Sequence, residues 1–197
     1  MGRKKYLDKV VEFINTTSVF RSKDIEKIIG NKEYAQLTLH LLSRRGFIHR
    51  LQKDCYSRYG DPTLTVYCFK PAYIGLQEAL SLHGLWEQET ITIIITVRKV
   101  RVGIRNILGN NVLIKRIHPK YFFGIELLEY NGLYIPISDI EKTIIDMIYF
   151  NQPIDKEIYQ QAKRKINKEK LEKYINKYPP NIKKKIRTKL GKNLGMN

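Results

Sequence analysis

Four polar side chains recur on one face of a helix that the sequence predicts between Asn31 and Gly46. Asn31 is a good N-cap, and Gly46 is placed where a glycine can end a helix. The inner face has apolar residues at helical spacing, namely Ala35, Leu39 and Leu42. The outer face carries groups that can reach base edges in the major groove, where Gln pairs with adenine and Arg with guanine. These residues are Lys32, Gln36, His40 and Arg44.

The segments on either side of this helix carry further cations. Ser22 is the predicted N-cap of a helix that ends before Gly30, and the free N–H groups of its first turn can hold a phosphate. Another helix is predicted over about 4–15, and strands over 46–51 and 55–59 form a hairpin. The predicted backbone-contacting residues are Arg21, Ser22, Lys23, Arg50, Lys53 and Arg58.

Three helices followed by a two-stranded hairpin are the element order of a winged helix-turn-helix. The stretch 42–48 resembles the end of the recognition helix in winged-helix regulators, where a leucine, polar residues, a glycine and an apolar pair lead into the wing. The same order also occurs in plain packing modules, some of which bind protein. Any single cation is more simply a solvated surface residue, but the whole set favours double-stranded DNA.

The net charge of +17 on 197 residues is distributed in blocks. Residues 1–60 carry +7, residues 98–120 carry +7 and residues 163–197 carry +11, with acidic stretches between them. Such blocks favour a polyanionic partner, although a lysine-rich host is an alternative. The second block predicts a further basic surface, which gives an RNA-binding alternative if the aromatic run 121–123 stacks bases rather than filling a core. Its residues are Arg98, Lys99, Arg101, Arg105, Lys115 and Arg116, with Lys120 beside them.

The fold class predicted for the chain is α+β. Residues 1–62 would form the winged helix-turn-helix, and residues 63–197 a mixed α/β domain with a basic helical tail from about 154. The second domain is expected to contain strands at 64–68, 91–97 and 112–114, and a helix over about 76–85. A hairpin over 125–137 would turn at Asn131-Gly132, with Pro136 confining its second strand to an edge or an end.

A group of charged residues follows that hairpin and raises the question of a metal-dependent nuclease. Glu141 and Asp146 are five residues apart on one predicted helix, so they point in different directions. Ser138 and Glu141 fit a capping box, and Lys142 with Asp146 fits an i, i+4 ion pair. His83 fits a helix C-terminus. The sequence has no phosphate-binding glycine motif, and we expect no catalytic residues, no metal and no cofactor.

Other sequence features limit where the protein can act. Cys55 and Cys68 are interpreted as neither a disulfide framework nor a zinc set. No stretch approaches the roughly 18 unbroken apolar residues of a membrane span, and residues 1–5 precede no apolar signal segment. These features predict a cytoplasmic protein without a membrane partner.

Three ordered stretches of the second domain resemble the AbiEi family of antitoxins from abortive-infection systems. Residues 73–85 resemble its helix with Ala-Leu and His-Gly, and residues 118–124 its Pro-x-x-Phe-Phe-Gly block. Residues 137–146 resemble its helix with Glu-Lys, two aliphatic residues and Asp. Together with the predicted winged helix, the resemblance covers nearly the whole chain.

Membership of this family would imply the antitoxin of a type IV toxin–antitoxin system. Its winged helix would bind inverted repeats in its own promoter, as a homodimer or as adjacent monomers, and repress transcription. Its second domain would neutralise a nucleotidyltransferase-like toxin without requiring a stable complex. The segment after residue 152 departs from the family in being short and very basic. A stand-alone regulator and an RNA-binding protein are the alternatives, and a nuclease or transferase is the third hypothesis.

Overall fold

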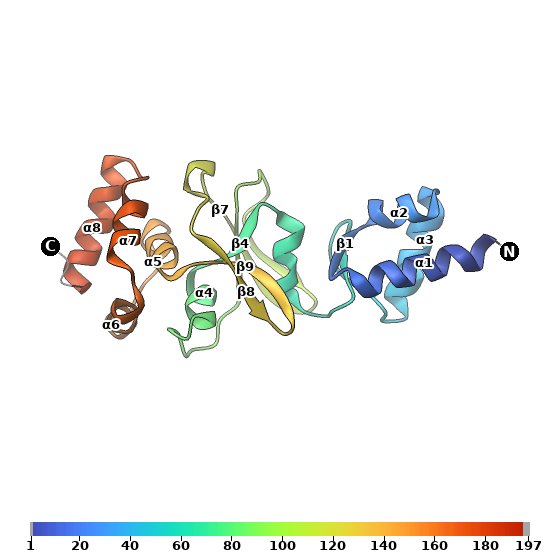
Figure 1. Cartoon of the computed structure of the whole chain (residues 1–197), viewed down its shortest axis with the longest axis horizontal. Helices are drawn as coiled ribbons and strands as arrows, with labels where there is room; N and C mark the ends of the chain where they lie inside the picture. Colours follow the sequence, from blue (N-terminus) through green and yellow to red (C-terminus); the bar gives the residue numbers. More distant parts are fainter. Residues whose placement is uncertain (1, 195–197) are drawn as a thin grey trace. The chain divides into compact units, whose positions relative to one another are not determined.

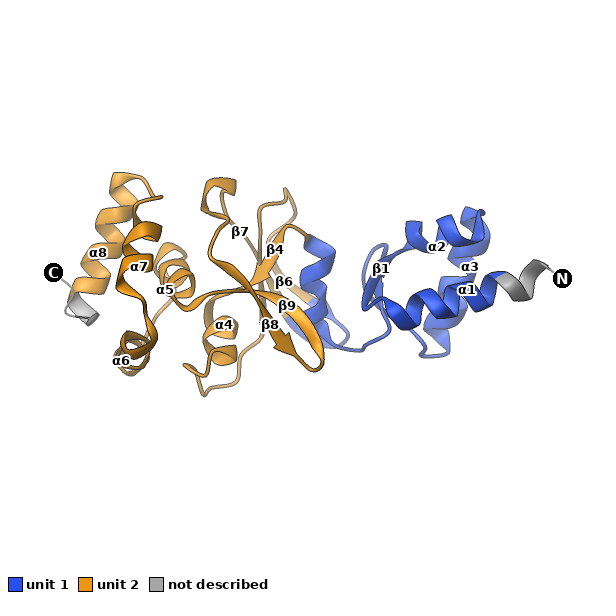
Figure 2. Cartoon of the chain, in the orientation of Figure 1, with its two compact units in different colours: residues 1–69, 106–111 blue, residues 70–105, 112–197 orange. Residues whose placement is uncertain are grey.

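A computed structural model describes the backbone of residues 2–194 and the side chains of residues 6–191 (Figure 1). The chain divides into two units, one of residues 1–69 with 106–111 and one of residues 70–105 with 112–197 (Figure 2). Helices and two separate sheets make the fold α+β, as predicted. The division follows Phe69, whereas the sequence placed it after residue 62.

The first unit contains three helices and a small sheet around one core. Its elements are α1 (Gly2–Thr16), β1 (Val19–Arg21), α2 (Ser22–Ile29), α3 (Lys32–Arg44), β2 (His49–Gln52), β3 (Cys55–Ser57) and the 3-10 helix η1 (Pro62–Phe69). The strand order is β1-β3-β2, and every pairing is antiparallel. Buried apolar residues from all three helices meet at Phe20, whose ring stacks on Tyr56 at 6.0 Å between centroids.

The helix ends of this unit follow from local chemistry. Gly30 closes α2 at φ 77°, a left-handed conformation that glycine adopts without steric cost. Asn31 caps α3, and its Oδ1 accepts a 2.8 Å hydrogen bond from the N–H of Tyr34, as predicted. The strand β1 was not predicted, because three residues are too few to show an alternating pattern.

Two expectations about residues 55–68 were wrong. The segment 62–69 is a 3-10 helix, not a strand, and its apolar residues are buried without alternation. Cys55 and Cys68 form a disulfide across a separation of 13 residues. The bond joins β3 to η1. The sequence did not predict it, because a straight strand over 64–68 would carry Cys68 away from the hairpin that contains Cys55.

The second unit is built on a six-stranded mixed sheet, of which residues 106–111, at one hairpin turn, are grouped with the first unit. Its elements are β4 (Ala72–Ile74), α4 (Leu76–Leu82), β5 (Thr92–Thr96), β6 (Gly103–Ile107), β7 (Asn110–Arg116), the 3-10 helix η2 (Pro119–Tyr121), β8 (Ile125–Tyr130), β9 (Leu133–Ser138), α5 (Ile140–Tyr149), α6 (Lys156–Lys165), α7 (Lys168–Ile175) and α8 (Pro180–Leu194). The strand order is β6-β7-β5-β4-β9-β8, in which β5 with β7 and β4 with β9 are parallel. The helix α5 packs against α4, α7 and α8, and its apolar residues belong to the main core.

The hairpin β8–β9 has the predicted turn but not the predicted place in the sheet. Asn131 and Gly132 both have positive φ, at 50° and 74°, as a type I′ turn requires. The strand β9 is not at an edge, because it lies between β8 and β4. Pro136 pairs with Leu127 in a non-hydrogen-bonded position, counted from the two-residue turn, so its missing N–H faces the β4 side. There the pairing consists of Ile74 with Ile137 alone, and no ladder hydrogen bond is lost at the proline.

Candidate nucleic-acid interface

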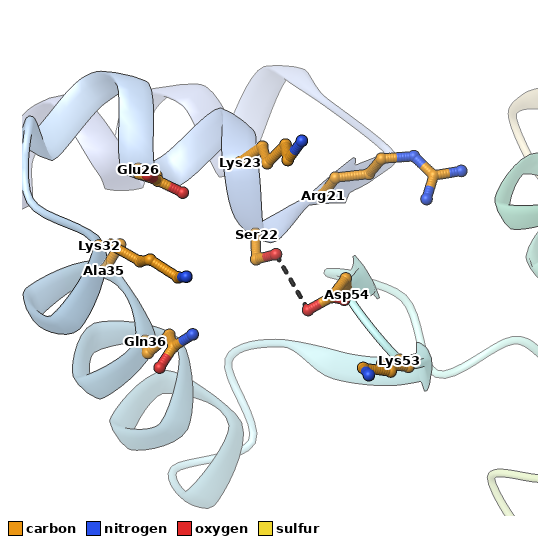
Figure 3. A pocket seen from close by; sticks show the side chains of 9 residues that line it. All are labelled: Arg21, Ser22, Lys23, Glu26, Lys32, Ala35, Gln36, Lys53 and Asp54. Carbon is orange, nitrogen blue, oxygen red and sulfur yellow. Dashed lines mark hydrogen bonds between the residues drawn. The ribbon is translucent and has the colours of Figure 1, made fainter.

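A hollow of about 480 Å³ lies between the start of α2, the start of α3 and the β2–β3 turn (Figure 3). Six of the ten residues predicted to contact DNA line it, although they come from three separate segments of the chain. They are Arg21, Ser22, Lys23, Lys32, Gln36 and Lys53, together with Glu26, Ala35 and Asp54. Figure 3 shows Lys32 and Gln36 pointing from α3 into the space that faces the turn.

The turn at Lys53-Asp54 forms the wall opposite the helices. Asp54 has φ 59°, and the reversal it makes places both residues on the hollow. The Ser22 hydroxyl donates a 3.2 Å hydrogen bond to Oδ1 of Asp54, which joins the start of α2 to the turn. Ser22 is therefore not the helix cap that the sequence predicted. The cap residue is Arg21, whose N–H donates to Oδ2 of Asp24 at 2.8 Å.

The hollow contains charges of both signs. Lys23, Lys32 and Lys53 bring three cations, and Glu26 and Asp54 bring two carboxylates, whereas the guanidinium of Arg21 is directed elsewhere. The side chains that face the hollow therefore carry a net positive charge of one, which suits an anionic ligand. The carboxylate of Asp54 accepts from the Ser22 hydroxyl, so this hydroxyl is already engaged within the first unit.

Two of the predicted arginines hold the first unit together. The Arg21 guanidinium turns away from the hollow, as Figure 3 shows, and its Nη2 donates to the carbonyl of Cys68 at 3.0 Å. Arg58 donates from Nη1 to the carbonyl of Asn15 at 2.7 Å, and its guanidinium lies 4.9 Å from the ring centre of Tyr59. Both side chains therefore have partners within the unit that the sequence could not reveal.

The remaining three predicted residues are exposed but lie outside the lining of the hollow. His40 and Arg44 continue the outer face of α3 beyond Gln36, and Arg50 lies on β2. Ala35 and Leu39 are 2% exposed on the opposite face, as the helical spacing predicted. The predicted orientation of α3 is thus confirmed.

The second predicted basic surface gathers at one end of the six-stranded sheet. Strands β5 and β7 are parallel and pair Thr96 with Arg116, so the segments that follow them emerge on the same side. The exposed residues near this end are Arg98, Lys99, Arg101 and Arg116, with Lys120 following in η2. Arg105 and Lys115 are partly buried. The Arg105 Nη2 donates to the carbonyl of Arg101 at 2.7 Å, and the Lys115 ammonium lies 5.1 Å from the ring centre of Phe150.

The aromatic run 121–123 is not placed to stack bases. All three rings are partly buried against the main core. Tyr121 stacks on Tyr178 at 4.4 Å between ring centroids, and Phe123 lies 5.0 Å from Tyr174. The run therefore packs against α7 and against the segment that connects α7 to α8.

The charged residues of α5 form a buried cluster, and Gly124 of the segment 118–124 lies against it. Lys142 and Asp146 make the predicted i, i+4 ion pair, and both side chains are 0% exposed. The Tyr73 hydroxyl donates to Oδ2 of Asp146 at 2.6 Å, and the Lys142 ammonium donates to the Tyr178 hydroxyl at 3.2 Å. The ammonium also lies 5.1 Å from the ring centre of Phe123. A pair so enclosed has no access to a substrate in this structure.

A second layer of the cluster fixes the start of α5. Asp139 caps the helix, because its Oδ1 accepts from the N–H of Lys142 at 2.8 Å, and its Oδ2 accepts from the Tyr174 hydroxyl at 2.8 Å. Glu141 accepts from the N–H of Asn167 at 2.7 Å, which satisfies the first turn of α7. The Lys170 ammonium bridges the two carboxylates at 3.1 and 3.0 Å. The predicted capping box between Ser138 and Glu141 is therefore wrong.

Ser138 and His83 belong to the same end of α5. The Ser138 hydroxyl lies 2.7 Å from the hydroxyl of Thr143, inside the core. His83 ends α4, as predicted, and its Nε2 lies 2.8 Å from the carbonyl of Ser138. Gly124 has φ 67°, and its carbonyl accepts from the N–H of Asp139 at 2.9 Å. A Cβ on this glycine would lie 2.8 Å from Cβ of Lys142, so a larger residue does not fit.

Burial and pairing set the pKa values in this cluster. Burial lowers the pKa of Lys142 and raises the pKa of Asp146, and their ion pair opposes both shifts. Burial also raises the pKa of Tyr174 to about 12, with help from its hydrogen bond to Asp139. Burial alone would raise the pKa of Glu141, but the N–H of Asn167 and the Lys170 ammonium outweigh it and lower the pKa.

Among the side chains of residues 6–191, no three of His, Cys, Asp or Glu come together as a metal site would require. Among the described helices, none combines the length and the apolar character needed to cross a bilayer.

Comparison with known proteins gives a fold relationship. No protein-family model and no curated protein matches the chain. The crystal structure of the Rv2827c protein from Mycobacterium tuberculosis is similar, with a TM-score of 0.61 at 12% sequence identity. The likeness covers 96% of this chain and 77% of the mycobacterial chain, so the two share a fold across nearly all of this protein.

Proposed function

We propose that this protein is a DNA-binding transcriptional repressor, whose first unit is a winged helix-turn-helix that binds an inverted repeat in its own promoter. The observation that carries the proposal is the convergence on one hollow of predicted residues from α2, α3 and the β2–β3 turn. In a winged helix-turn-helix the second helix of the motif enters the major groove, and the hairpin reaches the flanking backbone. The outer face of α3 and the turn at Lys53 supply those two parts here.

The side chains around the hollow would contribute differently to sequence specificity and to affinity. Gln36 is exposed on α3 and can hydrogen bond to an adenine edge. Lys23, Lys32 and Lys53 are exposed on the rim of the hollow and can neutralise phosphates. The carboxylates of Glu26 and Asp54 face the same space and would repel a phosphate, so they restrict the positions that the backbone can occupy.

The test is a binding assay with promoter DNA from upstream of the gene and a scrambled duplex of equal composition. We expect a Kd of about 10 nM or below for the promoter and much weaker binding to the scrambled duplex. Binding should weaken steeply with salt because phosphate contacts release counterions. Equal affinity for the two duplexes would refute the proposal.

Two substitutions separate base recognition from backbone binding. Gln36→Ala should reduce the preference for the promoter, whereas Lys53→Ala should weaken binding to every duplex alike. Lys27→Ala is the matched control, because Lys27 is exposed on α2 but does not line the hollow. A reversed pattern for Gln36 and Lys53 would show that α3 is not the recognition helix.

We further propose that the repressor is the antitoxin of a type IV toxin–antitoxin system. Support comes from the residues of the AbiEi-like motifs, since Gly124, Asp139, Glu141, Lys142 and Asp146 meet in one buried cluster. The functional partner would be a nucleotidyltransferase-like toxin encoded beside it. Expressing that toxin should arrest growth, and co-expressing this protein should restore growth. Continued arrest in the presence of well-expressed antitoxin would reject this part of the proposal and leave a stand-alone repressor.

The state of the repressor on its operator is a separate question. A two-fold repeat is bound either by a homodimer or by two monomers side by side. Light scattering with and without the promoter duplex separates these: a dimer that is present before DNA is added identifies the first arrangement.

An RNA-binding function is the second candidate, because exposed cations gather where β5 and β7 end. Competition between transfer RNA and promoter DNA in one gel-shift series ranks the two candidates. Preferential displacement by RNA, lost when Arg98, Lys99 and Arg116 are replaced with alanine, would favour RNA. The partly buried positions of residues 121–123 argue against base stacking at that surface.

A further inference from the structure

The outer face of α3 carries two exposed leucines. Leu37 is 52% exposed and Leu41 is 44% exposed, and they lie one turn apart on the same side of the helix. The buried side of α3 is made by Ala35, Thr38 and Leu39, so neither leucine belongs to the core. They border directly on the row formed by Gln36 and His40, which is also exposed.

A leucine pair in this position has a chemical use that a charged pair would not have. Single apolar residues on a surface are common, but these two share a helical face with side chains suited to base edges. In the major groove of DNA, thymine presents a C5 methyl group, and apolar side chains recognise it by contact. Leu37 lies three residues before His40, and Leu41 three before Arg44, so a methyl contact and a base-edge contact fall on neighbouring base pairs.

We propose that Leu37 and Leu41 contact the 5-methyl groups of thymines, so that the operator half-site contains A·T pairs beneath the middle of α3. This inference rests on the proposed DNA-binding function and specifies its ligand. The two leucines would thus contact thymine methyl groups in the major groove while Gln36 and Arg44 bind neighbouring base edges. Burying one methyl group against a leucine should increase affinity about fourfold.

The experiment uses the full chain and a duplex selected by the protein from a library of randomised duplexes. Each thymine of the selected duplex is replaced in turn by deoxyuridine, which removes the methyl group and keeps every hydrogen-bonding group of the base. We expect one or two replacements per half-site to weaken binding about fourfold each, and the others to have no effect.

The leucines are tested against the same duplexes. Leu37→Ala or Leu41→Ala should lose a similar factor on the thymine duplex and should no longer respond to the matching deoxyuridine, because the two groups act as a coupled pair. Leu7→Ala is the control, since Leu7 is 40% exposed on α1 and should respond to deoxyuridine as the wild type does. Thermal melting checks that the variants are folded.

The possible outcomes separate this inference from the function on which it rests. A duplex bound with clear sequence preference but indifferent to every deoxyuridine replacement would overturn the inference and leave the repressor intact. Loss of a dimer in light scattering on Leu37→Ala or Leu41→Ala, with unchanged methyl discrimination, would also overturn it by identifying a self-association surface. Failure to select any preferred duplex would reject the DNA-binding function itself, and the inference with it.

Discussion

Replacing Lys142 with methionine would leave the Asp146 carboxylate in the core without its cation. Both side chains are fully buried, and the remaining donor to Asp146 is the Tyr73 hydroxyl at 2.6 Å. Breaking a buried ion pair by removing one partner costs about 3–5 kcal/mol. Methionine is close to lysine in length and apolar, so lost packing adds little to this cost.

The protonation of Asp146 sets an upper limit to the stability that the protein loses on Lys142→Met. An aspartate that is forced to fold in its neutral form at pH 7 costs about 4 kcal/mol, taking an unfolded pKa of about 3.9. The folded pKa of Asp146 in the variant would be raised, so the folded state binds a proton that the unfolded state releases. The variant therefore regains stability as the pH falls, and at pH 5 the cost should be about 1.5 kcal/mol.

The assays are urea unfolding and thermal unfolding, both followed by circular dichroism at pH 7 and pH 5, at one fixed salt concentration. For the second unit, roughly 120 residues long, a loss of about 4 kcal/mol corresponds to a fall in Tm of about 15 °C. Lys163→Met is the matched control, because Lys163 is exposed on α6 and its replacement should change stability by less than about 0.5 kcal/mol.

A further variant removes the buried ion pair and the Tyr73 hydroxyl together. Tyr73→Phe, Lys142→Met and Asp146→Leu together should recover more than half of the lost stability, since both charges and the Tyr73 hydroxyl leave together and only the Tyr178 hydroxyl loses its partner. If Lys142→Met at pH 7 lies within about 1 kcal/mol of the wild type, and pH does not change that difference, the reasoning about the pair is refuted.

Other positions give shorter tests of the same structure. Gly124→Ala should destabilise the second unit by about 3 kcal/mol or more, because its Cβ would strike Cβ of Lys142 at a positive φ; unchanged unfolding in urea would contradict this. The stabilisation by Glu141, whose pKa is lowered, is present above its usual pKa and disappears as pH falls, so the deficit of Glu141→Gln should shrink between pH 6 and pH 3. A constant deficit would exclude the charge of Glu141 as its cause. Reducing the bond between Cys55 and Cys68 should cost the first unit about 3 kcal/mol, as measured by urea unfolding with and without dithiothreitol. Identical midpoints would show that the bond does not stabilise the unit.

The sequence predicted the elements whose signals are local. Asn31, Gly30 and the Asn131-Gly132 turn each determine a conformation within a few residues, and all three lie where expected. The apolar spacing of α3 was enough to orient it, because a helix face depends on residues three and four apart. Six of the residues that the sequence predicted to contact DNA line one hollow.

The features that the sequence did not reveal depend on contacts between distant residues. Arg21 meets the carbonyl of Cys68 across 47 positions, so nothing local separates it from a phosphate-binding arginine. Glu141 accepts from the N–H of Asn167, the cap of α7, and only the packing of that helix shows that Glu141 does not form the predicted capping box with Ser138. Short strands such as β4, with three residues, are defined by their neighbours rather than by their own pattern.

The disulfide between Cys55 and Cys68 closes a covalent ring that contains Arg58 as its one lysine or arginine. A protease that cuts after Arg58 opens this ring without separating the two sides of the cut. The fragments would migrate as one species on a gel until a reductant is added, and then as two. A chain with free thiols would come apart at the same cut without any reductant. Gel mobility with and without a reductant, after cleavage at Arg58, thus shows whether Cys55 and Cys68 are bonded.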